Sequence, residues 1–207
     1  MNKLTPVLNP LTLPNGAVLK NRLLMAPMTT CTGFYDGTVT SELVEYYRDR
    51  AGSIGTIIVE CCFIDRMGPA FPGAIAIDSD NKISGLKKIA DAIKSKGSKA
   101  ILQIYHGGRM VEPELIGGRT PVAPSAIAAP REGATQPNAL TGEEVETMIT
   151  QFGAAVNRAI KAGFDGVEIH GANTYLIQQF YSPHSNHRTD TWGGAPAKRA
   201  RFPPAVL

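Results

Sequence analysis

The stretch TGEEVETMITQFGAAVNRAIKAGF (residues 141–164), followed at once by DGVEIH (165–170), decides the fold. In its first part, Thr141 and Glu144 have the spacing of a capping box, and apolar residues recur with helical periodicity. The second part is a short apolar run, which is typical of a buried strand. A helix that leads directly into a strand predicts a βα repeat and therefore a parallel sheet.

The same alternation extends toward the N-terminus. Continuous apolar runs predict strands near 22–27, 56–60 and 100–106, and helical periodicity predicts helices over 41–51 and 81–97 between them. We expect the first of these strands to be buried on both faces. With the strand near 165–170, the chain then contains about four β/α units with right-handed crossovers.

Two further segments complete the organisation of the chain. Asn15-Gly16 lies between two short apolar runs, which predicts an N-terminal β-hairpin over 11–20. Residues 107–140 are rich in glycine and proline and have no periodicity, and we interpret them as an active-site loop, with a linker as the alternative. We assign all of these segments to a single domain, 1–207.

Two α/β architectures fit this pattern, a doubly wound sheet and part of a (β/α) barrel. No GxGxxG motif follows the first strand, so the dinucleotide-binding form of the doubly wound sheet has little support. Polar residues instead gather at the carboxyl ends of the expected strands, where barrels carry their active sites. The sequence therefore favours the α/β fold of (β/α)8 TIM barrels, here with about four units and thus incomplete.

Composition excludes several classes of protein. The chain is 43% hydrophobic and 19% charged, and its net charge of +3 (21 basic minus 18 acidic residues) is spread along the sequence, which argues against nucleic-acid binding. No apolar run is long enough to span a membrane, and the N-terminal segment lacks the apolar stretch of a signal peptide, so we expect a cytoplasmic protein. The sequence predicts no metal site. Its three cysteines include no CxxC pair, and His184 and His187 lie among residues that favour turns.

Four polar residues near strand ends are candidates for chemistry. His170 and Asn173 can hold a carbonyl oxygen as charge develops on it, and the Tyr175 phenol can deliver a proton to the adjacent carbon. The alternative is a core histidine and a packing aromatic residue. Gln103 places an amide in a buried strand, so it needs a partner, either the imide edge of a heteroaromatic cofactor or a water or backbone group.

Several motifs, in this order and spacing, resemble the old yellow enzyme family of FMN-dependent ene-reductases. They are KNRLLMAPMTT, GTIIVE, ILQIYHGGR, PVAPSAI, LTGEEVETMITQF and AGFDGVEIHGANTYLIQQFYSPHSNHRTDTWGG. The resemblance implies a (β/α)8 barrel with FMN at its carboxyl-terminal mouth. It also implies reduction of the flavin by NADH or NADPH, followed by hydride transfer to the activated C=C of an α,β-unsaturated carbonyl compound.

The resemblance also assigns roles to individual residues. The flavin site it implies consists of Pro27, Met28, Thr29, Cys61, Gln103 and His170. In that site Gln103 binds the pyrimidine ring, and Cys61 occupies a position that is usually small. For catalysis the resemblance implies that His170 and Asn173 hold the substrate carbonyl and that Tyr175 is the proton donor. Thr174 stands where the family commonly has glycine, which matters if this backbone needs a positive φ.

The family continues to eight strands, whereas this sequence reaches about four. A half-barrel exposes strand edges and apolar helix faces, so we expect it to associate into a homo-oligomer unless another segment completes it. The small-molecule substrate that we expect is an enone, a dienoyl thioester, a nitroalkene or a quinone, and the sequence does not choose among them. The alternatives are a truncated, non-catalytic fragment that binds no flavin and, more weakly, a metal-dependent hydrolase.

Overall fold

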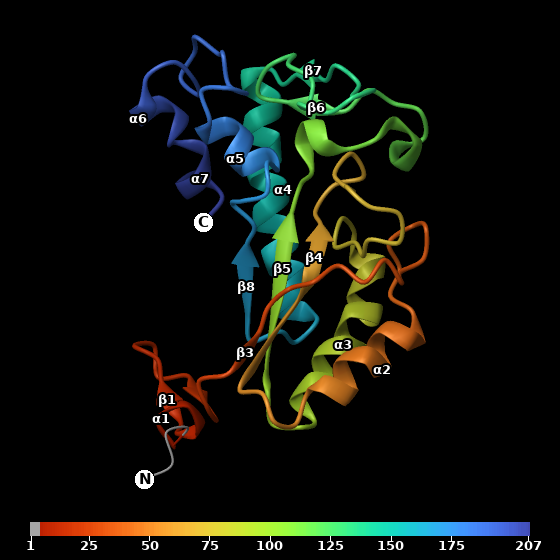
Figure 1. The fold of residues 1–207 in the computed structure, drawn as a ribbon, viewed down its shortest axis with the longest axis vertical. Helices are drawn as coiled ribbons and strands as arrows, with labels where there is room; N and C mark the ends of the chain where they lie inside the picture. Colours follow the sequence, from red (N-terminus) through yellow and green to blue (C-terminus); the bar gives the residue numbers. More distant parts are fainter. Residues whose placement is uncertain (1–4) are drawn as a thin grey trace.

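A computed structural model describes residues 5–207, so the first four residues of the expected domain 1–207 lie outside the described residues. Its central sheet has four parallel strands: β3 (Leu24–Met25), β4 (Thr56–Phe63), β5 (Lys99–Tyr105) and β8 (Gly166–Ile169). Their order in space, β3-β4-β5-β8, follows their order in the chain, and all four point the same way (Figure 1). A doubly wound sheet reverses its strand order at one point, so the sequential order is that of a barrel segment.

Three helices pack against one face of this sheet. They are α2 (Ser41–Arg50), α3 (Ile83–Lys94) and α4 (Gly142–Lys161), and their apolar stripes share a core with alternate residues of the strands. Leu102 and Ile104 of β5 belong to this core and are fully buried. Ile101 points to the opposite face of the sheet and is only partly buried. We call the face that carries Ile101 and Gln103 the inner face, because it corresponds to the interior of a barrel.

The long helix α4 begins as the sequence predicts. Thr141 Oγ1 accepts a hydrogen bond from the Glu144 backbone N–H at 3.2 Å, and the Glu144 carboxylate accepts one from the Thr141 N–H at 2.7 Å. The reciprocal pair satisfies two N–H groups that have no partner within the helix. The capping-box prediction is confirmed.

We expect Thr141→Ala to lower the free energy of unfolding by about 1 kcal/mol, because it removes one half of this capping box. Urea denaturation checks the value. Thr147→Ala is the matched control, since the Thr147 hydroxyl bonds to the Glu143 carbonyl within the helix and caps nothing. Equal losses in the two variants would contradict the capping role.

The prediction that residues 22–27 form a strand buried on both faces is wrong. Only Leu24 and Met25 pair with β4, and Leu24 is 55% exposed. β3 is the edge of the sheet, so no further strand covers its outer side in the described chain. In contrast, β4 continues to Phe63, beyond the predicted end at residue 60, because Cys61 and Cys62 extend its apolar run.

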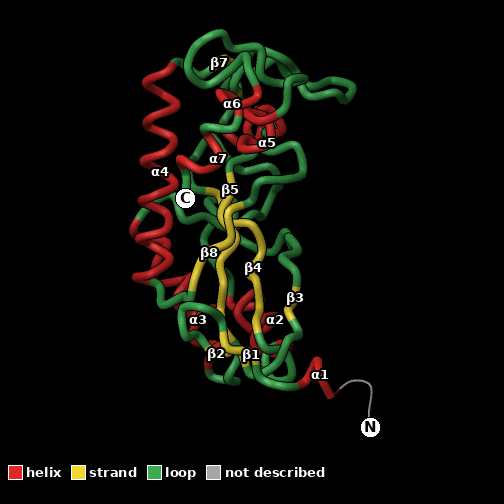
Figure 2. The backbone as a smooth tube through the Cα atoms, turned by 90° about the vertical axis from the view of Figure 1, so that its left-hand side faces the viewer, coloured by secondary structure: helices red, strands yellow, loops and turns green. Residues whose placement is uncertain are grey.

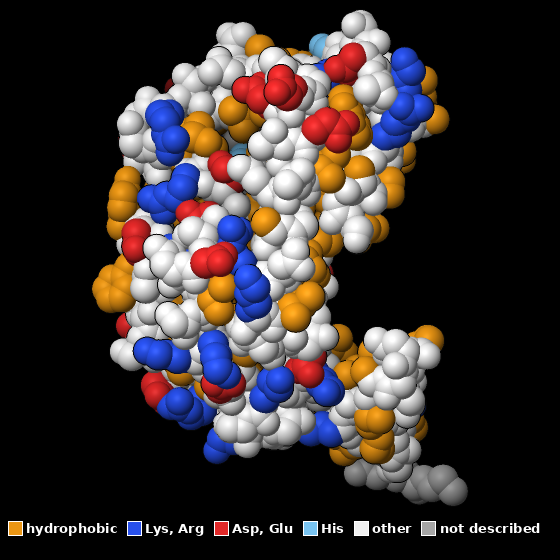
Figure 3. All heavy atoms as spheres, turned by 180° about the vertical axis from the view of Figure 1, so that it is seen from behind, with side chains coloured by type: hydrophobic (Ala, Val, Ile, Leu, Met, Phe, Trp, Pro, Cys, Tyr) orange, Lys and Arg blue, Asp and Glu red, His pale blue; other side chains and the backbone are white. Residues whose placement is uncertain are grey.

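The N-terminal hairpin lies at the amino ends of the strands. After the short helix α1 (Thr5–Leu8), β1 (Leu11–Thr12) pairs antiparallel with β2 (Val18–Leu19), and Gly16 turns the chain with φ 84°. The hairpin lies below the sheet in Figure 1, and the space-filling view shows a hollow between the hairpin and the part of the molecule above it (Figure 3). A mainly apolar cavity of about 480 Å³ separates the hairpin from the first residues of the sheet.

The carboxyl ends of the strands meet a layer of loops and short helices (Figures 1 and 2). Besides the short 3-10 helix η1 (Asp80–Lys82), which precedes α3, the remaining elements are η2 (Gly108–Met110), η3 (Pro113–Ile116), β6 (Val122–Ala123), β7 (Asn138–Ala139), α5 (Leu176–Tyr181), α6 (Pro196–Arg199) and α7 (Phe202–Ala205). Phe180 and Phe202 stack with ring centroids 4.0 Å apart and attach α7 to α5. None of the helices within residues 5–207 is long and apolar enough to cross a lipid bilayer.

Candidate active site

His170, Asn173 and Tyr175 come together where β8 ends. β8 places His170 at its carboxyl end, and a tight turn then leads to Tyr175, which is the N-cap of α5. The His170 and Tyr175 rings meet edge to face with centroids 4.8 Å apart, and Asn173 Nδ2 lies 3.4 Å from His170 Nε2. The three side chains therefore form one cluster, as the sequence predicts.

Local hydrogen bonding fixes the tautomer of His170. The Ala172 backbone N–H donates to His170 Nδ1 at 3.2 Å, so in the neutral ring the proton sits on Nε2. Burial lowers the pKa of His170, and the charge of Glu168 opposes this only in part, so the ring is neutral at pH 7. Nε2–H and the Asn173 amide are then two donors that cannot bond to each other. They are arranged to share one acceptor oxygen.

The surroundings of Tyr175 keep its phenol protonated. Its side chain packs among Cys61 and Tyr105, and the Tyr105 and Tyr175 ring centroids are 5.1 Å apart. Burial, with a smaller contribution from Cys61, raises the pKa of Tyr175 to about 12. The phenol therefore keeps its proton at neutral pH and can donate it.

The turn before Tyr175 has an unusual backbone. Asn173 has φ 53° and Thr174 has φ 61°, so two successive non-glycine residues are left-handed. Each such residue costs about 1–3 kcal/mol unless its surroundings hold it. The positive φ at Thr174 explains why glycine is common there in the family that the sequence resembles. It also means that other contacts must hold this turn.

Gln103 has a side-chain partner that sequence reasoning missed. Its Nε2 donates to Glu168 Oε1 at 2.7 Å across the β5–β8 pair, where the two residues are directly opposite. The available signal was Glu168 itself, two positions before His170 and therefore on the same inner face. The bond leaves Gln103 with one free N–H and its carbonyl oxygen. That is one donor and one acceptor side by side.

The loop after β3 reaches the same site from the other side. Thr29 Oγ1 lies 3.3 Å from Cys61 Sγ, while Met28, which follows Pro27, is 65% exposed. A register shift between Val59 and Cys62 adds one residue to β4, and Cys61 joins the Tyr105–Tyr175 cluster. Burial raises the pKa of Cys61 to about 11, so this free thiol is neutral and behaves as a small apolar group.

Beneath this loop lies a buried carboxyl group, that of Glu60 in β4. Glu60 is fully buried, and its Oε2 accepts hydrogen bonds from the Thr30 backbone N–H and the Tyr47 hydroxyl, both at 3.2 Å. Desolvation raises the pKa of Glu60. These bonds tie the loop after β3 to helix α2.

The donor set fits FMN. The pyrimidine edge of a flavin alternates carbonyl oxygens with an imide N–H, and the free donor and acceptor of Gln103 match one of each. The Thr29 hydroxyl adds a hydrogen-bonding group, and the exposed Met28 thioether offers an apolar surface for a flat ring. Within residues 5–207, no group of histidine, cysteine or acidic residues is arranged to hold a metal ion.

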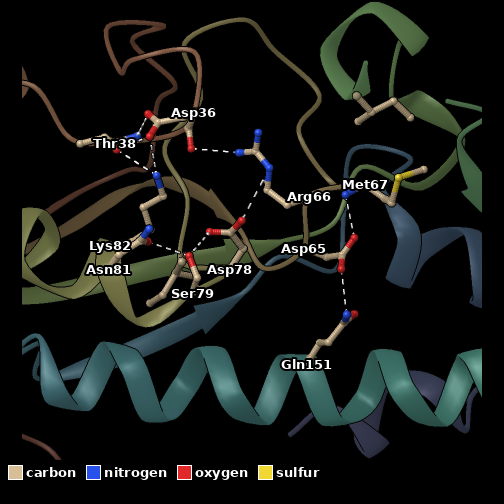
Figure 4. Close-up of polar contacts among 12 residues, drawn as sticks. Asp36, Thr38, Asp65, Arg66, Met67, Asp78, Ser79, Asn81, Lys82 and Gln151 are labelled. Carbon is tan, nitrogen blue, oxygen red and sulfur yellow. Dashed lines mark hydrogen bonds and ion pairs between the residues drawn. The ribbon is translucent and has the colours of Figure 1, made fainter. Parts of the chain in front are cut away.

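A second polar cluster lies outside the strand ends, against α4 (Figure 4). It surrounds a cavity of about 660 Å³. Lys82 Nζ contacts Asp36 Oδ2 at 2.9 Å, and Gln151 Nε2 contacts Asp65 Oδ2 at 2.8 Å. Lys82 and Asp36 form an ion pair and Asp65 accepts a hydrogen bond, so these groups are satisfied within the cluster. None of the predicted site residues lies there, so it is not the candidate active site.

The chain is similar to known proteins of one family. Residues 6–207 match the family described as NADH:flavin oxidoreductase / NADH oxidase. The chain is 79% identical over 201 residues to the NADH:fumarate oxidoreductase of Klebsiella pneumoniae and 61% identical over 193 residues to the NADH:acrylate oxidoreductase of Vibrio harveyi. Among solved structures, the old yellow enzyme homologue from Zymomonas mobilis matches with a TM-score of 0.88 and 35% identity.

The coverage of these matches is uneven. They include 97%, 93% and 97% of this chain, but only 22% of the Klebsiella protein, 19% of the Vibrio protein and 58% of the Zymomonas chain. The chain thus spans about a fifth of the length of the two curated relatives and just over half of the solved barrel. The likeness confirms the predicted resemblance and the partial TIM-barrel fold.

Proposed function

The chain belongs to the NADH:flavin oxidoreductase / NADH oxidase family, and from that premise we propose that it forms the flavin site of an enzyme that reduces an activated alkene. The cofactors of this family are FMN and NADH. One observation carries the proposal: two hydrogen-bond donors, on His170 and Asn173, lie beside a phenol that stays protonated. Enolate chemistry needs this combination of groups.

Each residue has a defined task in this proposal. Gln103 and Thr29 bind and orient the flavin. Bound FMN supplies a hydride that originates from NADH. His170 Nε2–H and the Asn173 amide hold the acceptor oxygen of the substrate, which stabilises the negative charge that develops there when the β-carbon gains hydride. Tyr175 then donates the phenolic proton to the α-carbon.

The names of the two curated relatives indicate a substrate class. Fumarate and acrylate both have a C=C bond conjugated to a carboxylate, so an oxygen acceptor lies next to the reducible bond. The donor pair suits such an oxygen. Enones, dienoyl thioesters, nitroalkenes and quinones present an acceptor oxygen in the same relation and belong to the same proposed class.

Flavin binding is the first test. The purified chain is titrated with FMN and followed by quenching of flavin fluorescence and by gel filtration with visible absorbance. Flavin that elutes with the protein, is reduced by NADH and is then reoxidised by fumarate, acrylate or an enone supports the proposal. A colourless protein that binds no added FMN would contradict it and favour a non-catalytic fragment.

We expect Gln103→Met to weaken FMN binding by about 10- to 100-fold, because the methionine removes one donor and one acceptor, together about 1–3 kcal/mol. The titration described above measures the dissociation constant. Gln136→Met is the matched control, since Gln136 is exposed in the 107–140 loop and bonds only to the Ala126 carbonyl among the described contacts. Equal affinities for the Gln103 variant and the unsubstituted protein would remove Gln103 from the flavin site.

A further inference from the structure

We propose that Gln179 is the positioning residue that holds the proton-donor turn, residues 172–175, in its left-handed conformation. The inference deepens the proposed function and rests on it, because it concerns the presentation of Tyr175. Gln179 lies in α5, one helical turn after Tyr175, and is 1% exposed. It touches neither His170 nor Asn173 through any hydrogen bond found in the described chain, so it acts only through the backbone.

The side-chain amide of Gln179 uses all of its hydrogen-bonding groups. Its Oε1 accepts from the Arg109 backbone N–H at 3.1 Å. Its Nε2 donates to the Gly107 carbonyl at 3.0 Å and to the Thr174 carbonyl at 2.6 Å. An amide has one acceptor end and two donor hydrogens, so these three partners allow only one orientation of the group. Gln179 therefore links the turn after β5 to the turn after β8.

The turn after β5 is shaped to receive this amide. Gly108 has φ 60°, and a Cβ atom built there would lie 2.2 Å from Gln179 Oε1. Only glycine permits both this backbone conformation and this close approach. The His106 carbonyl of the same turn also accepts a hydrogen bond from the Leu176 N–H at 2.9 Å. Two contacts thus fix the start of α5 against β5, the strand that carries Gln103.

The peptide groups around Thr174 are held from both sides by successive glutamines. The Thr174 N–H donates to Gln178 Oε1, and its carbonyl accepts from Gln179 Nε2. The Gln179 backbone N–H also donates to the Tyr175 carbonyl at 2.8 Å. Without the Gln179 amide, the Thr174 carbonyl loses its bond, and the β-branched Thr174 has less to keep it at positive φ. Tyr175, the next residue, would then lose its fixed position.

The test separates the two half-reactions of the FMN-loaded protein. In stopped-flow measurements, Gln179→Met is expected to slow flavin reoxidation by fumarate, acrylate or an enone by about 10- to 100-fold. The reason is that Tyr175 loses its fixed position, and a misplaced catalytic group slows the step that it serves. Reduction by NADH should change by no more than about two-fold, because it needs no proton from Tyr175. Gln179→Glu is the second variant. It keeps the oxygen that accepts from the Arg109 N–H but replaces the donor Nε2 with an oxygen that faces the Gly107 and Thr174 carbonyls.

Ser185→Ala is the matched control. The Ser185 hydroxyl donates to the Gln179 backbone carbonyl at 2.8 Å and is buried, so its loss removes a hydrogen bond at the same place without touching Thr174. We expect this variant to lose stability and keep both half-reactions. In a Tyr175→Phe background, Gln179→Met should cause no further loss of the reoxidation rate, since the group that it positions is already absent.

Hydrogen exchange provides a readout that does not depend on activity. The Thr174 and Tyr175 amides should exchange faster in the Gln179 variants but not in Ser185→Ala. Unchanged exchange, equal slowing of both half-reactions, or a full additional loss in the Tyr175→Phe background would each overturn the inference. If Tyr175→Phe itself leaves reoxidation unchanged, the proposed proton donor is wrong, and the exchange rates alone then decide whether Gln179 holds the turn.

Discussion

Tyr175→Phe is expected to slow reoxidation of the reduced flavin by an alkene by about 10²- to 10⁴-fold, the range that a positioned general acid contributes. The substitution removes only the hydroxyl, so the ring packing with His170 and Tyr105 remains. Because burial raises the pKa of Tyr175 to about 12, the unsubstituted enzyme is expected to show no loss of proton donation up to mildly alkaline pH. Stopped-flow absorbance of the flavin measures both rates.

Tyr181→Phe is the matched control for this experiment. Tyr181 ends α5, the helix that Tyr175 caps, and the residue is 59% exposed. It should leave both half-reactions unchanged. Reduction of the flavin by NADH should stay the same in Tyr175→Phe as well, since that step forms no C–H bond from a protein proton. A Tyr175→Phe enzyme that reduces alkenes at the original rate would show that the proton comes from another group, such as water.

The elements that the sequence predicted best depend on local interactions. Helix α4 follows from a capping box and a regular apolar stripe, and both features lie within the segment that they define. The cluster at the end of β8 was also predictable, because His170, Asn173 and Tyr175 are close in sequence and the strand delivers them to one edge. The roles of these residues remain predictions that the variants above test.

The features that the sequence did not reveal depend on distant neighbours. The exposure of Leu24 results from the edge position of β3, which no local pattern encodes. The partner of Gln103 is Glu168, 65 residues away, and their pairing needs the register of β5 and β8. Gln179 bridges two turns from different strands, so its function is visible only when both are in place. The local indication was a pair of adjacent amides, Gln178 and Gln179, in an otherwise apolar helix.

The second large effect is expected at His170. His170→Ala removes one of the two donors directed at the substrate oxygen, and the loss of such a donor lowers the rate of the step that develops charge by about 10²- to 10³-fold. We expect this loss in flavin reoxidation by an alkene, and weaker binding of the alkene as well. His184→Ala is the matched control, because His184 is exposed in the loop after α5. An equal rate in the His170 variant would leave Asn173 as the sole donor.

His170 also makes stability depend on pH in a direction that can be checked. Burial lowers its pKa, so the unfolded chain, with a pKa of about 6.5, takes up a proton before the folded protein does. The neutral ring therefore contributes stability that is fully present above about pH 6.5 and is lost as the pH falls toward the lowered value. Urea denaturation at several pH values should show a smaller decline in acid for His170→Ala than for His184→Ala. The same decline in both variants would mean that His170 is not the buried neutral donor that the hydrogen bond from Ala172 indicates.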